Sequence, residues 1–201
     1  MTRSTTICNM AISHLGVGKT ISDVDTGTEQ EAIACRVFYD DALKKLYNDF
    51  PWPFASKVQA LSLITTNPTN EWGYSYAYPT DCGRFNKIQS GTDFDNRQSR
   101  ITYRVTNNGS QRVIYTDQVD AIGEFTEIID DELLMSSDFK FAFSFLLAAL
   151  IAPRLTKGDP FKTKNDMFNN YFNLISKAQA NALNEEQSPV EPESEFIRGR
   201  E

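Results

Sequence analysis

The few side chains that could carry chemistry are scattered along the sequence. His14 is the only histidine, so the chain offers no histidine pair for a metal ion and no second imidazole for a proton relay. It lies beside an apolar stretch, which favours a structural role. Cys8, Cys35 and Cys82 are odd in number and widely spaced. We therefore expect free thiols rather than a disulfide framework or a metal site.

The acidic residues form two dense clusters. Asp40 and Asp41 are neighbours on a predicted helix, where adjacent side chains point to different faces, so they make a poor shared acid and base. Asp130, Asp131 and Glu132 precede another predicted helix, and we expect them to suit the positive end of its dipole. No GxSxG, HExxH or CxxC motif occurs in the sequence. We expect no enzyme activity, no catalytic residues, no bound metal and no cofactor.

Gly18, Lys19 and Thr20 imitate the end of a phosphate-binding loop. The complete motif needs a glycine five residues before Gly18, where this chain has Ser13. It also needs a strand before the loop and a helix after it, whereas a helix is predicted before this one. Nucleotide binding is therefore not expected.

The charge of the chain excludes one broad class of function. The 201 residues include 40% hydrophobic and 23% charged ones, as in an ordinary globular protein, and the formal net charge is -7. This is the wrong sign for gripping nucleic acid by neutralising phosphates. The N-terminal residues lack the apolar stretch and cleavage site of a secretory signal, so we expect assembly in the cytosol.

The most apolar segment, residues 139–155, is predicted to be a buried helix around which the chain is organised. From residue 139 to 151 only Lys140 and Ser144 interrupt the apolar run, so several faces of this helix must be covered. Any of residues 136–138 can cap its start, and Pro153 with Gly158 marks its end. A membrane span needs about 20 apolar residues, and this run is shorter. We expect no membrane span.

Two further helices are predicted before it. A short one covers about residues 7–15 and is capped by Ser4 or Thr5. A long one opens with a capping box at Thr28–Glu31 and runs to about Phe50.

The sequence PWPF stops the long helix. Pro51 and Pro53 cannot stay inside a helix, while Trp52 and Phe54 are large apolar groups that need cover. These two rings are predicted to anchor the turn from helix to sheet.

A last long helix is predicted to be capped by Asp159 and to open at Pro160. We expect it to pack against the central helix. Its expected apolar face comprises Phe161, Phe168, Tyr171, Phe172, Ile175 and Ala178.

Alternating apolar residues replace helical periodicity from residue 57 to 127. Strands are expected over residues 58–64, 74–78, 84–89, 101–105, 112–115 and 119–126. The fourth and fifth are joined by the hairpin signal at 107–109, and residues 90–99 form an exposed polar loop.

The predicted fold is therefore α+β: an antiparallel helical bundle with an inserted small antiparallel β domain and an extended C-terminal tail. The bundle comprises residues 1–56 and 128–184, the β domain 57–127 and the tail 185–201. The tail is rich in proline and acids and cannot bury enough surface to fold alone.

Several motifs occur in a specific order along most of the chain. They are HLG at 14–16 with IS at 21–22, ACRVFYDDALKKL at 34–46, PWPFA at 51–55, YAYPTDC at 76–82 and YFNLISKAQANALNEEQ at 171–187. Together they resemble the tail tubular protein A family, the head-to-tail adaptors of short-tailed double-stranded DNA bacteriophages. The family often has asparagine where Pro53 stands and tryptophan where Phe196 stands, and residues 88–123 match poorly.

The resemblance implies a structural virion protein of the tail, located at the portal junction and assembled in the host cytoplasm. Family members form a dodecameric ring that binds the portal protein and carries the tail nozzle protein, and double-stranded DNA passes through the ring as cargo. The tail residues Phe196, Ile197, Arg198 and Arg200 are then predicted to anchor the chain to the portal or to a neighbouring subunit.

Two alternatives remain at this point. One is a neck or head-completion protein of a long-tailed phage, which can share a helical bundle with a small β unit. The other is a small phage hydrolase whose acids act as general acid and base. Loss of assembly without measurable turnover separates the structural roles from the hydrolase. A gene for a large β-rich nozzle protein directly downstream favours the adaptor.

Overall fold

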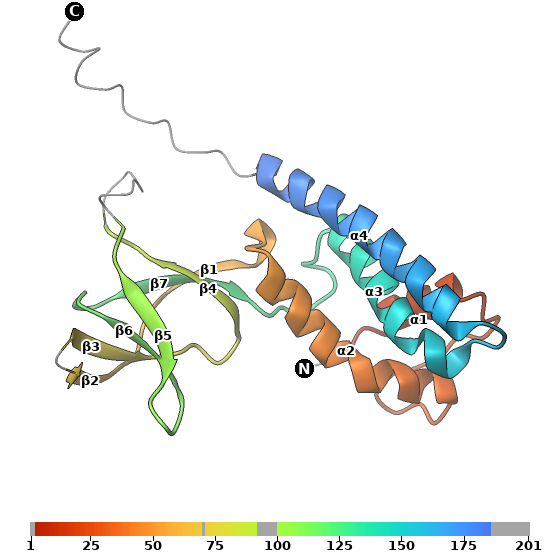
Figure 1. The fold of residues 1–201 in the computed structure, drawn as a ribbon, viewed down its shortest axis with the longest axis horizontal. Helices are drawn as coiled ribbons and strands as arrows, with labels where there is room; N and C mark the ends of the chain where they lie inside the picture. Colours follow the sequence, from red (N-terminus) through yellow and green to blue (C-terminus); the bar gives the residue numbers. More distant parts are fainter. Residues whose placement is uncertain (1–2, 70, 92–99, 186–201) are drawn as a thin grey trace, which may run out of the picture. The chain divides into compact units, whose positions relative to one another are not determined.

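A computed structural model describes residues 3–69, 71–91 and 100–185 of the chain (Figure 1). Within this part it contains four helices, with two small antiparallel β-sheets inserted between the second helix and the third. The predicted α+β class is confirmed. None of the described helices combines the length and the hydrophobicity that crossing a bilayer requires.

The contacts divide the chain into two compact units. The helical unit comprises Met1–Lys57, Asp81–Phe85 and Phe125–Glu185. The β unit comprises Val58–Thr80 and Asn86–Glu124.

Four helices build the helical unit: α1 Thr5–His14, α2 Gln30–Asp49, α3 Ser137–Leu155 and α4 Pro160–Glu185. The central helix α3 packs against the three others (Figure 1). Ten of its residues are buried on several sides, as its apolar run predicts. The side chain of Ser136 caps its start by accepting a hydrogen bond from Phe139 N.

The central helix ends at Leu155, the last residue of its predicted segment, and Thr156 N bonds to Ala152 O at 3.0 Å to close the turn after Pro153. The predicted start of the long helix before it is wrong. The capping box at Thr28–Glu31 is not formed: α2 begins at Gln30 without a side-chain cap. The carboxylate of Glu31 is instead turned to Lys19 Nζ, 3.5 Å away.

The strands form two sheets. The three-stranded sheet has the order β1-β7-β4, with β1 Ser56–Ala60, β7 Ile122–Glu127 and β4 Cys82–Ile88. The four-stranded sheet has the order β2-β3-β6-β5, with β2 Leu63–Thr69, β3 Trp72–Ala77, β6 Arg112–Thr116 and β5 Tyr103–Asn107. The predicted hairpin at 107–109 joins β5 to β6, and Gly109 supplies the positive φ of 95°.

The prediction of one continuous strand over residues 58–64 is wrong. The segment breaks after Ala60, and its two halves enter different sheets as β1 and β2. Leu61 is buried at the break, and its N–H bonds to Ala121 O at 2.9 Å. This non-local bond has no counterpart in the local alternation of the sequence.

Candidate functional site

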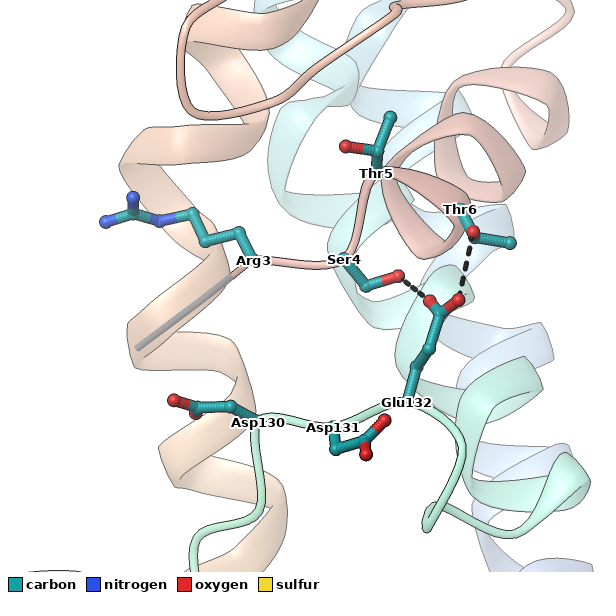
Figure 2. Close-up of a pocket in the computed structure, with 7 residues that line it drawn as sticks. All are labelled: Arg3, Ser4, Thr5, Thr6, Asp130, Asp131 and Glu132. Carbon is teal, nitrogen blue, oxygen red and sulfur yellow. Dashed lines mark hydrogen bonds between the residues drawn. The ribbon is translucent and has the colours of Figure 1, made fainter.

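A pocket of about 540 Å³ lies beside the start of α1 (Figure 2). Glu132 lies inside it and accepts hydrogen bonds from Ser4 Oγ and, at 3.2 Å, from Thr6 Oγ1. For Glu132, the expectation that the acidic cluster serves the helix following it in sequence is therefore wrong. Glu132 is bonded to the first turn of α1, where its charge suits the positive end of that dipole. The pocket is lined by Arg3, Ser4, Thr5, Thr6, Asp130, Asp131 and Glu132.

Arg3 points away from Glu132 in Figure 2. It donates to Asp25 Oδ1 at 2.6 Å and to Asp40 Oδ2 at 2.7 Å. The hydrogen bond to Asp25, followed by the bond to Asp40, raises the pKa of the Arg3 guanidinium. Asp40 is thus paired, while its neighbour Asp41 is exposed. The two carboxylates face different surroundings, as their adjacency on α2 predicts.

His14 is packed rather than poised for catalysis. Its ring stacks on Phe145 with centroids 3.8 Å apart, and its Nε2 lies 3.0 Å from Ser144 Oγ. Burial lowers the pKa of this imidazole, which favours the neutral form. These contacts give His14 a structural part in joining α1 to α3.

The cysteines and Lys19, the remaining candidates for a chemical role, also have structural contacts. Cys8, Cys35 and Cys82 are buried free thiols, and hydrogen bonding to Cys35, then burial, raises the pKa of Cys8. Lys19, from the loop that imitates a phosphate site, pairs with Glu31. Among the described residues, no group of three histidines, cysteines or acids is placed to hold a metal ion.

Trp52 and Phe54 lie in an aromatic cluster centred on Phe139. The Trp52 ring is buried, its Nε1 donates to Leu46 O at 2.9 Å, and it meets Phe139 edge-on with centroids 5.0 Å apart. Phe54 is partly buried, with its centroid 5.2 Å from that of Phe139. The other predicted anchor residues, Phe196, Ile197, Arg198 and Arg200, lie outside the described residues.

Exposed apolar side chains are the feature that sequence reasoning missed. Phe161 and Phe172 were expected in the buried face of the last helix, but they are 69% and 58% exposed. Tyr171 and Ile175 face the core as predicted. The signal was present in the sequence, since the apolar positions of α4 span a wider arc than one neighbouring helix can cover.

Other large apolar residues are exposed on both units. Leu133, Leu134 and Phe141 belong to the helical unit, as do Ile33 and Val37 on α2. In the β unit they are Val58, Leu63, Ile64, Val119 and Ile122. Singly exposed apolar groups are common on protein surfaces, and only those that lie next to one another point to a surface that binds a partner.

Neither known family models nor curated proteins gave a match to this chain.

Proposed function

We propose that this chain is a structural virion protein, a ring-forming head-to-tail adaptor that joins the portal to the tail nozzle and surrounds the path of the genome. The ordered set of motifs that resembles the tail tubular protein A family carries this proposal. Within the described residues, these motifs fall at the end of α1 and in the loop after it, on α2, on the turn that contains Trp52, on the β3 to β4 segment and on α4.

The described residues support an assembly role by what their side chains do. Three of the side chains that could have served a hydrolase are bonded to other parts of the helical unit: Glu132 to the start of α1, Asp40 to Arg3, and His14 to Ser144. Exposed apolar groups, in contrast, remain on both units. A ring is built from unlike surfaces that meet between copies, so it needs such groups and no reaction centre.

The negative net charge fits the proposed conduit. The chain carries -7 overall, so it does not attract DNA phosphates as a whole. A duct that lets a duplex slide gains from weak phosphate binding, because each basic contact would hold the DNA.

The test is electron microscopy of the purified chain, alone and mixed with the portal encoded by the same genome. We expect monomers or weak association when the chain is alone, and a ring on the portal in the mixture. A stable closed ring without the portal would contradict the first expectation. No binding to the portal, or measurable hydrolytic turnover, would overturn the adaptor proposal.

Within this function, the β unit faces the nozzle. The hairpin tip at 107–110 is exposed, and the polar segment 91–98 lies almost entirely outside the described residues. Deletion of residues 91–98 should weaken nozzle attachment and leave portal attachment intact. The reverse result would show that the orientation is wrong.

The C-terminal tail contributes the portal anchor in this proposal. Truncation after Asn184 should leave the melting temperature nearly unchanged and weaken portal binding, and Phe196→Ala should reproduce much of that loss. Infectious particles assembled normally with the truncated protein would contradict the anchor.

A further inference from the structure

The outer side of α2 carries a ridge, a row of side chains with two aliphatic residues in the middle and an acid at each end. Glu29, Ile33, Val37 and Asp41 follow one another at intervals of four residues, so they lie along one i, i+4 row. Ile33 and Val37 are 43% and 50% exposed. Glu29 and Asp41, at the two ends of the row, are exposed acids.

A second ridge on α4 has the opposite charge. Lys164, Phe168 and Phe172 also lie at intervals of four residues, and Phe172 is 58% exposed while Phe168 is partly buried against the core of its own unit. The ammonium of Lys164 lies 5.7 Å from the Phe168 ring centroid, and the Phe168 and Phe172 rings stack with centroids 6.3 Å apart. Phe161, one turn before Lys164, is exposed and lies on the same side of α4.

Both ridges start at the same end of the helical unit. Tyr47 near the end of α2 packs on Phe139 near the start of α3, so these helices are antiparallel. The bond of 2.6 Å between Asn181 and Asp138 makes α4 antiparallel to α3 as well. α2 and α4 therefore run in the same direction, and the N-terminal residues Glu29 and Lys164 lie at one level.

The two ridges also belong to different sides of the unit. α2 and α4 each pack against α3 and share no comparable contact with each other (Figure 1). The helical unit thus presents one acidic and aliphatic ridge and one basic and aromatic ridge. Such a pair is the requirement for a head-to-tail contact, in which each copy shows its neighbour an unlike surface.

We infer that the α4 ridge of one copy packs on the α2 ridge of the next copy, with Phe168 and Phe172 against Ile33 and Val37 and with Lys164 near Glu29. The inference rests on the proposed ring and names the faces that form it. Copies related by a rotation axis keep the same height along it, so groups at one level of the unit meet across the contact when α2 and α4 run along that axis. The i, i+4 ridges of two helices can interdigitate, and the lysine then meets an opposite charge.

Cysteine cross-linking tests this contact directly. The native cysteines are buried, so Val37→Cys and Phe172→Cys each add one exposed thiol. Mixing the two single variants under mild oxidation, over a concentration series and on the portal, should give a mixed dimer in excess of either homodimer. The double variant should give a ladder of higher oligomers.

The matched control replaces Phe172→Cys by Leu183→Cys, an exposed position on the same helix but 11 residues further along. At a rise of about 1.5 Å per residue it lies roughly 16 Å from the proposed contact, so its cross-linking to Val37→Cys should be much slower. Equal yields for the two pairs would overturn the inference. Homodimers in excess would also overturn it, because they indicate a two-fold contact.

A charge exchange sharpens the test. Lys164→Glu should slow the mixed cross-link by about two- to fivefold, the effect of an exposed ion pair, and Glu29→Lys in the other copy should restore it. No slowing, or no restoration, would contradict the pairing of these two groups.

The outcomes separate this inference from the proposed function. If the chain forms a ring on the portal but gives no mixed cross-link, the assigned contact faces are wrong and the adaptor role still holds. The mixed cross-link without any portal binding would keep the contact and remove the adaptor role.

Discussion

The helical unit and the β unit both expose large apolar residues, but the helical unit combines them with a tightly packed aromatic cluster. In the helical unit, rings from α2, α3 and the turn after α2 gather around Phe139, which is fully buried. In the β unit, strand β2 exposes all of its residues except Pro68, which is partly buried, although the strand begins with Leu63 and Ile64. The helical unit thus combines a packed aromatic core with exposed apolar groups on α2 and α4, whereas in the β unit an edge strand keeps its apolar side chains at the surface.

The edge strand β2 is protected against uncontrolled pairing. It contains Pro68, which cannot donate a ladder hydrogen bond, and Asn67, whose φ of 47° interrupts the extended backbone. Its register against β3 shifts twice along its length. These features leave apolar side chains exposed while limiting strand addition by unrelated chains.

The largest expected effect breaks the helical core. Phe139→Ala should lower the free energy of unfolding of the helical unit by about 3–5 kcal/mol, because it removes the ring that the others contact. Trp52, which meets Phe139 edge-on, provides a fluorescence probe of this unfolding. The control is Phe141→Ala, two residues away and 50% exposed, which should cost less than about 1 kcal/mol. Equal losses would contradict a core centred on Phe139.

Two strand glycines compare packing in the two units. A Cβ added at Gly83 would lie 2.8 Å from Tyr47 Cβ in the helical unit, so Gly83→Ala should cost about 1–3 kcal/mol in denaturant unfolding. At Gly73 in the β unit the nearest atom would be Asp117 Oδ1 at 3.6 Å, an ordinary contact. Gly73→Ala should therefore be nearly neutral. A larger cost at Gly73 than at Gly83 would reverse the proposed contrast in packing.

A buried hydroxyl provides a smaller test within the β unit. The Tyr76 hydroxyl donates to Gln118 O at 2.9 Å and accepts from Ala121 N at 3.3 Å. Tyr76→Phe should lower the free energy of unfolding of this unit by about 1–2 kcal/mol, since two backbone groups lose their partner. Trp72 in strand β3 reports this unit by fluorescence in a Trp52→Phe background. Tyr74→Phe in the same strand is the control, and an equal loss there would contradict the role of the Tyr76 hydroxyl.

The sequence predicted the features that depend on residues close together in the chain. The apolar run of α3 must be covered on several sides, and the positive φ at position 109 requires only that this residue is glycine. Both features were therefore readable from the sequence, as was the α+β class.

Errors arose where a distant segment competes for the same group. Glu31 could have closed a capping box with Thr28, but its carboxylate lies 3.5 Å from Lys19 Nζ instead. Glu132 could have served the following helix, but Ser4 and Thr6 of α1 reach it across the fold. No spacing rule contains these pairings. The exposure of Phe161 and Phe172 is different, because the wide apolar arc of α4 already indicated that one neighbouring helix could not cover all of it.

The smallest predicted effect is a pH dependence confined to the helical unit. Ser144 Oγ donates its one proton to Phe141 O at 2.7 Å, so at His14 the Nε2–H donates to Ser144 Oγ, 3.0 Å away. Burial lowers the pKa of His14 in the folded chain below the unfolded value of about 6.5. The unfolded chain therefore binds a proton first as the pH falls.

The stability that neutral His14 contributes is thus fully present above about pH 6.5 and is lost as the pH falls through the folded pKa. His14→Gln keeps an N–H donor near Ser144 but does not titrate. The free energy of unfolding of the wild-type chain minus that of His14→Gln should decrease between about pH 8 and pH 5. The carboxylates cancel in this difference because both chains contain them. His14 is the only histidine, so no other imidazole contributes. A difference that stays flat, or that rises on acidification, would show that the imidazole is not held neutral by its burial against α3.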